Sequence, residues 1–186
     1  KISVLVGASL CTLALIAPPA AAASLAGQSF EDTTPLAATT LMLNGLGLRS
    51  VFIIRGYVAG LYLGHKSNSG PEVMAMAAPK RLQLRMLRQA SAHDFNSALI
   101  SGIRENASPA QMQALQERVD QLANIIVGIG GTASGDVINF DYTEAQGTTL
   151  SVNGKLKGTT LSVNGKLKGT AIAGADFYAA VLSIFV

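Results

Sequence analysis

Residues 43–64 read LNGLGLRSVFIIRGYVAGLYLG, and this stretch carries more information about the fold than any other part of the chain. Within it, residues 51–63 are apolar at odd and even positions alike and are rich in β-branched and aromatic side chains. That pattern predicts a strand that is covered on both faces, because an exposed face would require alternating polar residues. A bend is expected at Gly56 or Gly60.

Arg49 is the residue of this stretch with the clearest chemical meaning. Gly45 and Gly47 allow a tight bend before it, and the apolar strand that follows offers few other polar side chains. An arginine at the mouth of an apolar wall can hold an anionic or phenolic oxygen through two parallel hydrogen bonds. The alternative is an ion pair with an acid such as Glu31 or Asp32, and spacing alone favours that alternative.

Several other segments show strand patterns. Residues 28–43 change from polar to Thr-rich and apolar, which suits a strand that enters a sheet, and residues 65–71 are expected to form a loop. Residues 80–89 alternate between apolar and polar side chains, so they predict a strand with one solvated face. Strands are expected again at residues 137–143 and through the segment that follows.

Two helices are predicted in the middle of the chain. Ser91 can cap a helix that runs to about Asn106, and Ser108 followed by Pro109 opens a second helix that ends in the glycine-rich text GIGGTASGD. Their buried faces contain Phe95, Leu99 and Ile103 in the first helix, and Met112, Leu115, Val119 and Leu122 in the second. A last helix is expected over residues 174–186. This order predicts an α+β fold with helices packed on one face of an antiparallel sheet.

Residues 148–169 contain the same eleven residues, TTLSVNGKLKG, twice without a difference. Each copy includes Asn-Gly, which is the strongest short signal for a β-hairpin. Two units are too few to stack into a repeat core, so the pattern indicates a tandem duplication of one hairpin and not the functional site.

The geometry of the two hairpins follows from their leucines. A three-residue loop over residues 152–154 pairs Leu150 with Leu156. The hairpin then has one apolar, buried face and one solvated face that carries the lysines, so we expect this loop in preference to a two-residue turn. The same rule pairs Leu161 with Leu167 in the second copy. Leu156 and Leu161 are an odd number of residues apart, so an unbroken strand would point them to opposite faces. We therefore expect a break after the first copy and one hairpin outside the sheet.

The first 23 residues have the pattern of a secretory signal peptide, with a basic first residue, an apolar run broken by two prolines, and small residues at Ala21 and Ala23. We expect cleavage before Ser24, a periplasmic location in a Gram-negative bacterium, and no membrane anchor on the mature chain. The alternative, a membrane-spanning anchor, would need a longer apolar run. Residues 24–186 then form a single domain. Because the chain stops within an apolar run, we expect a truncation at Val186.

Composition excludes several classes of protein. The net charge is +3, but four of the seven lysines lie in the repeat, so the chain without one copy carries only +1, and Trp is absent. Nucleic-acid binding is therefore not expected. The single cysteine, Cys11, leaves with the signal peptide, and His65 and His93 stand outside any HxH or HExxH spacing. There is no G-x-S-x-G motif. We expect neither a metal nor a cofactor.

Several segments, taken together and in order, resemble the chalcone isomerase superfamily, and specifically its bacterial exported chalcone isomerase-like members. The resemblance runs from about Phe30 to the end of the chain. It rests on LNGLGLR, YVAGLYL, PKRLQLRMLR, DFNSALISGIRENAS, GDVINFDY, TTLSVNGKLKGT and GADFYAAVLSIFV. It implies an open-faced β-sandwich, in which a large antiparallel sheet carries helices on one face and a ligand cleft lies between them. Similar proteins have one SVNGK hairpin and continue past the final helix.

The resemblance also implies a set of site residues. In the plant enzymes of the family an arginine after GGAG binds and polarises the chalcone, and it matches Arg49; the strand threonine falls at Tyr57, the helix tyrosine at Phe95 and the asparagine at Gly102. Phe95 cannot donate a hydrogen bond and Gly102 has no side chain. We therefore expect a non-catalytic binder of a small hydrophobic anion, a fatty acid or a phenolic compound, held by these residues and Leu99. The alternatives are an isomerase of the chalcone–flavanone type and a structural or assembly protein without a ligand.

Overall fold

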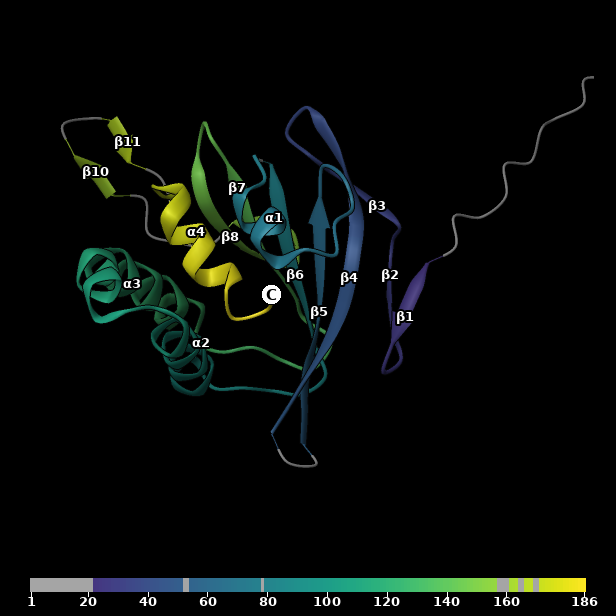
Figure 1. Cartoon of the computed structure of the whole chain (residues 1–186). Helices are drawn as coiled ribbons and strands as arrows, with labels where there is room; N and C mark the ends of the chain where they lie inside the picture. The colour runs from purple at the N-terminus through teal and green to yellow at the C-terminus, as the bar shows by residue number, and fades with distance from the viewer. Residues whose placement is uncertain (1–21, 52–53, 78, 157–160, 164–165, 169–170) are drawn as a thin grey trace, which may run out of the picture.

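The computed structural model describes residues 22–51, 54–77, 79–156, 161–163, 166–168 and 171–186. A large antiparallel sheet runs through the molecule in the order β12-β8-β7-β6-β5-β4-β3, with β9 paired to β8 (Figure 1). Its strands are β3 (Thr33–Leu36), β4 (Thr39–Val51), β5 (Ile54–Leu63), β6 (Lys80–Met86), β7 (Val137–Thr143), β8 (Gly147–Val152), β9 (Lys155–Leu156) and β12 (Ala171–Ile172). Every neighbouring pair in this sheet is antiparallel, as the sequence predicted.

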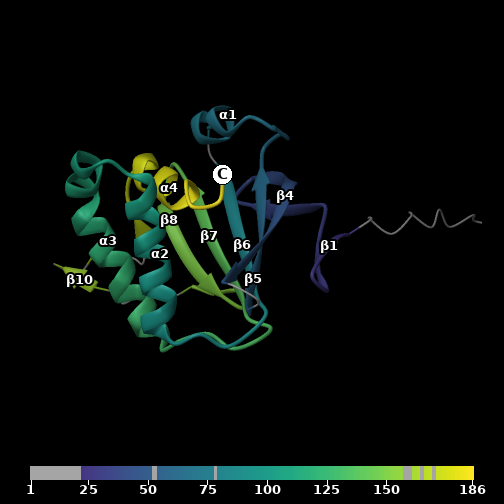
Figure 2. The ribbon, with the colours of Figure 1, turned by 60° about the horizontal axis from the view of Figure 1, so that its bottom comes forward.

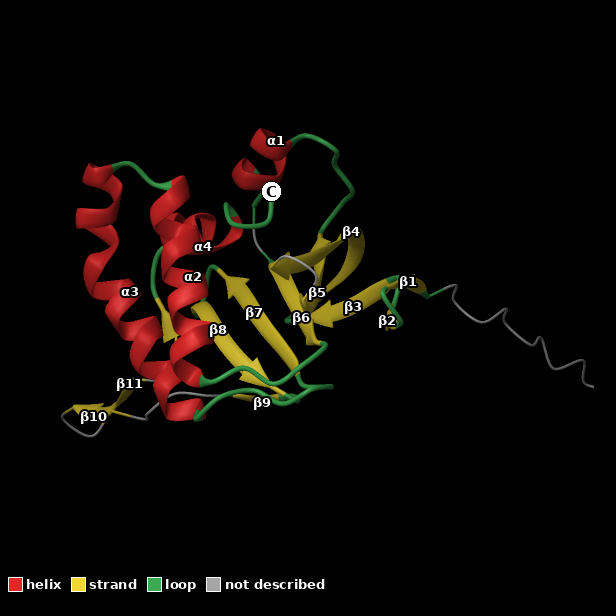
Figure 3. Ribbon diagram, turned by 90° about the horizontal axis from the view of Figure 1, so that it is seen from below, coloured by secondary structure: helices red, strands yellow, loops and turns green. Residues whose placement is uncertain are grey.

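Helices cover one face of the sheet. They are α2 (Ala92–Asn106), α3 (Pro109–Ile129) and α4 (Ala175–Leu182), and a short helix α1 (Gly70–Ala75) lies at one end (Figures 2 and 3). Ser91 caps α2 by accepting a hydrogen bond from the Asp94 backbone at 3.1 Å, and Ser108 forms a capping box with Gln111 at the start of α3. The predicted α+β class and the starts of both long helices are therefore confirmed. No helix of the described residues is long and apolar enough to cross a membrane.

The opposite face of the sheet carries a small hairpin, β1 (Ala23–Leu25) and β2 (Gln28–Phe30), which lies away from the helices (Figure 2). Phe30 packs so closely on β5 that a Cβ atom at Gly60 would lie 2.6 Å from its ring, which is why this position holds glycine. The even-numbered Val58 and Tyr62 join this smaller core, while the odd-numbered Ala59 and Leu63 join the larger core under the helices. The prediction that this strand is covered on both faces is confirmed for β5.

Gly45 and Gly47 would allow a tight bend before Arg49, but no such bend forms. β4 runs without interruption through Gly45 and Gly47, and the chain reverses between Val51 and Ile54, which pair with each other. Residues 52 and 53 of the predicted strand lie outside the described residues. Gly45 pairs with Leu61 and Gly47 with Ala59 of β5, so the ladder favours an extended conformation over a turn at both glycines.

The expected strand over residues 28–43 is also divided. β2 ends at Phe30 before β3 begins at Thr33, and the chain turns between β3 and β4 at Ala37, which has a positive φ angle of 52°. β2, β3 and the start of β4 therefore replace one entering strand. The segment expected to be only a loop, residues 65–71, leads into α1, which Ser69 caps through the Glu72 backbone.

The three-residue loop predicted for the first hairpin is wrong. Val152 pairs with Lys155, so the turn contains two residues, Asn153 and Gly154, with φ angles of 49° and 75° that indicate a type I′ turn. The prediction assumed that one face of the hairpin is buried and the other solvated, but every residue of β8 is buried. Asn153 adds a further reason, since its side chain accepts a hydrogen bond from the Val137 backbone at 2.9 Å.

The second copy has the same register as the first. Leu161 pairs with Lys168 and Val163 with Lys166, so the predicted pairing of Leu161 with Leu167 is also wrong. Its strands, β10 (Leu161–Val163) and β11 (Lys166–Lys168), form a separate two-stranded sheet and join no other strand in the described parts of the chain (Figure 1). The expectation that one copy leaves the main sheet agrees with this arrangement.

Candidate functional site

Two side chains predicted for the site are direct neighbours across the β4–β5 ladder. Arg49 pairs with Tyr57, and Tyr57 packs against the core under the helices, so both lie on the helical face of the sheet. β-Bulges interrupt the ladder on either side of this pair, at Asn44 on β4 and at Gly56 on β5. Bulges re-aim the side chains next to them and are common beside functional sites.

A cavity of about 350 Å³ lies between this pair and α2. We call it the α2 cavity. Its apolar wall consists of Tyr57, Met86, Ala90, Phe95, Ala98, Leu99 and Ile184, and its polar lining of Arg49, Arg88, Gln89 and Asp94. Arg49, Tyr57, Phe95 and Leu99, four of the five residues predicted for the site, thus meet in one cavity.

Gly102, the fifth predicted residue, is not part of that lining. It lies further along α2 and is buried beneath Ile184, so close that a Cβ atom at this position would be 2.9 Å from Ile184 Cγ2. Glycine at this place lets the segment after α4 pack against α2. Its contribution to the cavity is therefore indirect, because Ile184 itself lines the wall.

The guanidinium of Arg49 is exposed and makes no hydrogen bond or ion pair with any residue that the structure describes. The ion pair with Asp32 or Glu31 is not formed. The Leu43 backbone N–H donates a hydrogen bond to the Asp32 carbonyl oxygen at 2.8 Å, so Asp32 lies beside Leu43. Leu43 and Arg49 are six residues apart along β4, which separates Asp32 from Arg49 by roughly 20 Å. Glu31 lies beside Tyr62, whose hydroxyl donates to the Glu31 carbonyl oxygen at 3.0 Å.

Tyr57 supplies a hydroxyl group next to this cation. Burial raises the pKa of Tyr57 above its ordinary value, and the positive charge of Arg49 offsets this effect only in part. The hydroxyl therefore stays protonated at neutral pH and can donate a hydrogen bond to an anion on Arg49. The Tyr57 ring also contacts Phe185, with 6.3 Å between the ring centroids.

Arg88 and Ile184 also line the cavity, although neither was predicted from the sequence. A signal for Arg88 was present, because Leu82, Leu84 and Met86 alternate onto the helical face and Arg88 continues the same parity just after β6. Ile184 had no comparable signal, because its place in the lining depends on how the segment after α4 folds back. The one acid of the α2 cavity, Asp94, accepts a hydrogen bond from the Ser91 hydroxyl at 2.8 Å.

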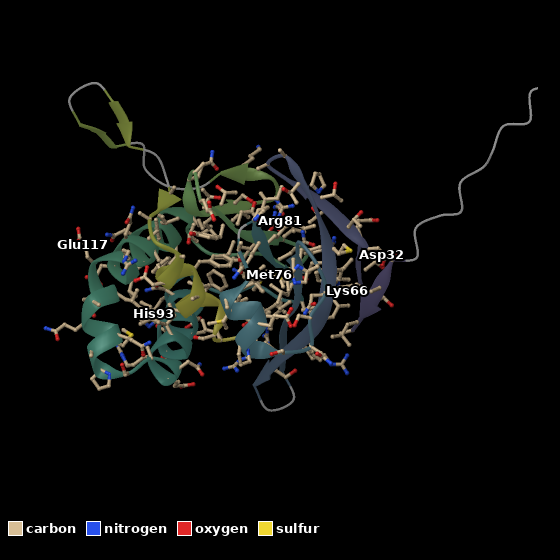
Figure 4. All side chains as sticks on the ribbon, turned by 45° about the horizontal axis from the view of Figure 1, so that its top comes forward. Asp32, Lys66, Met76, Arg81, His93 and Glu117 are labelled. Carbon is tan, nitrogen blue, oxygen red and sulfur yellow. The ribbon has the colours of Figure 1, made fainter. Side chains whose placement is uncertain are left out.

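The two histidines lie outside the cavity. His93 is exposed in the first turn of α2, on the helical side of the molecule, whereas Asp32 lies on the other side of the sheet (Figure 4). His65 Nε2 lies 3.4 Å from a carboxylate oxygen of the exposed Glu72. Within the described residues, no cluster of three or more His, Cys, Asp or Glu side chains could hold a metal ion. In the α2 cavity, Arg49 and Tyr57 can hold an anionic oxygen while the apolar wall contacts the rest of the molecule that carries it.

Comparisons with known proteins agree with this architecture. A solved structure of a fatty-acid binding protein from Arabidopsis thaliana superimposes with a TM-score of 0.54 at 13% sequence identity, over 86% of this chain and 96% of the plant chain. This likeness confirms the chalcone isomerase-like fold expected from the sequence. A search of curated proteins finds no match. A family model described as chalcone isomerase-like matches residues 22–161, which is 140 of the 186 residues. The chain therefore belongs to the chalcone isomerase-like family.

Proposed function

We propose that the protein binds a small hydrophobic anion, such as a fatty acid or a phenolic compound, without converting it. One observation carries this proposal: the guanidinium of Arg49 lines an apolar cavity and has no partner among the described residues. A cation in that position has hydrogen-bond donors to offer, and planar guanidinium donors match a carboxylate in pairs.

The cavity suits the rest of such a ligand. Its volume of about 350 Å³ falls within the range of small-molecule sites, at the lower end. Met86, Phe95 and Leu99 are buried members of its wall and would contact the apolar chain or ring. The neutral hydroxyl of Tyr57 would donate a second hydrogen bond to the oxygen on Arg49.

The plant neighbour supports the same class of ligand, since its name describes fatty-acid binding. Family membership alone is compatible with both a binder and an isomerase. The lining of the α2 cavity favours a binder. Phe95 offers no hydrogen bond where the plant isomerases have a tyrosine, and Gly102 has no side chain and lies beneath Ile184. Arg49 and the Tyr57 hydroxyl can polarise a substrate, but without donors from α2 they do not orient it for cyclisation.

Two assays test the proposal. In the first, dodecanoate and the neutral dodecanol each displace a fluorescent fatty-acid probe. We expect dodecanoate to bind at least about tenfold more tightly, because only its carboxylate is negatively charged and accepts a pair of hydrogen bonds from the guanidinium. In the second, chalcone cyclisation is followed by absorbance, and we expect turnover near background. Failure of both dodecyl compounds to bind would favour the structural role, and efficient cyclisation that depends on Arg49 would establish the isomerase.

A further inference from the structure

A second cavity adjoins the first. It has a volume of about 440 Å³ and lies between β4, residues 67–70 and the segment after α4; we call it the β4 cavity. Arg49, Tyr57 and Ile184 line both cavities. The cationic group proposed as the anchor therefore stands at the junction of two spaces and not at the end of one.

The two cavities differ in their polar groups. The β4 cavity has uncharged polar groups from Asn44, Ser67, Asn68 and Ser69. The polar groups of the α2 cavity, Arg88, Gln89 and Asp94, lie beside a larger apolar wall that includes Met86, Phe95 and Leu99. Asn44 is the extra residue of the bulge in β4. Its side-chain oxygen accepts a hydrogen bond from the Ser67 backbone at 2.7 Å, and its amide N–H groups donate to no residue that the structure describes. These donors are available to a polar group inside the cavity.

The side of the β4 cavity formed by the sheet is open because two of its residues lack side chains. Gly45 and Gly47 lie on the same face of β4 as Arg49 and face Leu61 and Ala59 of β5. Neither glycine has a positive φ angle, and a Cβ atom added at either position would meet nothing within 4 Å in the described structure. Backbone geometry and packing thus leave glycine unexplained here, while glycine inside a strand weakens it and often marks the close approach of a ligand.

We propose that the natural ligand carries its carboxylate at a branch point, with a long apolar arm in the α2 cavity and a short polar arm in the β4 cavity. This inference rests on the proposed function, because it places the carboxylate on Arg49. N-acyl amino acids with a polar side chain have this chemistry: the α-carboxylate, the acyl chain and the side chain all diverge from one carbon atom. A simple fatty acid would fill only one of the two spaces.

Isothermal titration calorimetry with two matched probes tests the second arm. N-dodecanoylglycine has the carboxylate and the apolar arm only, and N-dodecanoyl-L-glutamine adds a polar arm. We expect the glutamine compound to bind about tenfold more tightly, which corresponds to one or two new hydrogen bonds with Asn44 or the neighbouring loop. Gly47→Val fills the β4 cavity with a residue that strands favour, and it should abolish the difference between the probes.

Two further variants keep the test decisive. Gly128→Ala adds a methyl group at a helical glycine that also has nothing within 4 Å and lines neither cavity, so it should retain the tenfold difference. Gly47→Ala replaces Gly47→Val if circular dichroism shows that the valine variant does not fold. The two-arm inference would be overturned if the wild type bound both probes equally, or if the difference survived the Gly47 substitutions. In either case, binding of N-dodecanoylglycine would still support the proposed function. If neither probe binds, the proposed function and this inference both fail.

Discussion

Replacement of Arg49 by alanine tests the proposed anchor. Such a change removes every donor of the guanidinium and leaves the apolar wall of the α2 cavity intact. A hydrogen bond between charged groups contributes about 1.5–3 kcal/mol, and Arg49 is exposed, so screening by salt places the expected loss toward the lower part of this range. We therefore expect dodecanoate to bind about 10- to 30-fold more weakly to Arg49→Ala.

Calorimetry with dodecanoate at two salt concentrations would measure this loss. Arg49→Lys should recover only part of the affinity, because an ammonium group lacks the planar pair of donors. Arg55→Ala is the matched control: Arg55 is an exposed arginine of the same hairpin that lines neither cavity, so its removal should leave the affinity unchanged. Equal affinities of wild type and Arg49→Ala would refute the anchor. Equal losses in Arg49→Ala and Arg55→Ala would show that only the net charge of the hairpin matters.

Four further outcomes are expected. Tyr57→Phe should weaken dodecanoate binding about three- to tenfold in the same titration, since one neutral hydrogen bond is lost. Deletion of residues 159–169 should leave the melting temperature unchanged or raise it, because β10 and β11 pair with each other and not with the main sheet; a loss of several kcal/mol would show that both copies are integral. Burial strongly raises the pKa of Tyr178, so above about pH 10 the folded state keeps a proton that the unfolded state loses. The free energy of unfolding should therefore fall above about pH 10, by up to about 1.4 kcal/mol per pH unit. Melting curves at alkaline pH should show this fall, and it should be smaller in Tyr178→Phe. The mass of the exported protein should correspond to a chain that begins at Ser24, and retention of residues 1–23 would contradict the signal peptide.

The long helices were predictable because their signals are local. Ser91 and Ser108 each cap a helix with hydrogen bonds inside a single turn, and the apolar spacing that follows them needs no knowledge of the rest of the chain. The alternation of β6 is equally local, because each residue of a strand points to the face opposite its neighbour.

The strand ends were not predictable in the same way. Whether a glycine-containing segment bends or pairs depends on the strand beside it, and Gly45 and Gly47 lie in a continuous β4 because β5 pairs with them. The predicted length of the loop in the first repeat hairpin was wrong for a related reason. That prediction assumed one buried and one solvated face, but other elements bury β8 on both sides.

The candidate site shows the same division. Resemblance to the family pointed to Arg49, Tyr57, Phe95 and Gly102, and the helical spacing added Leu99. The structure brings all of these except Gly102 to one cavity. The resemblance did not place Ile184, which reaches the cavity only because the chain after α4 folds back onto α2. Nor did it predict a second cavity on the other side of the Arg49–Tyr57 pair, since a cavity is a property of packing between several elements and leaves no periodic pattern in the sequence.

The charge state of a bound carboxylate tests the central claim most directly. Octanoate labelled with ¹³C at its carboxyl carbon reports its own ionisation through its chemical shift when bound to the protein. If the carboxylate lies on Arg49, the adjacent positive charge lowers its pKa, so bound octanoate should remain ionised at pH values where free octanoate is already protonated, and Arg49→Ala should remove this shift. A bound carboxyl group whose pKa equals or exceeds that of free octanoate in the wild type would contradict the account, because a carboxylate in an apolar cavity without a cation is more easily protonated, not less.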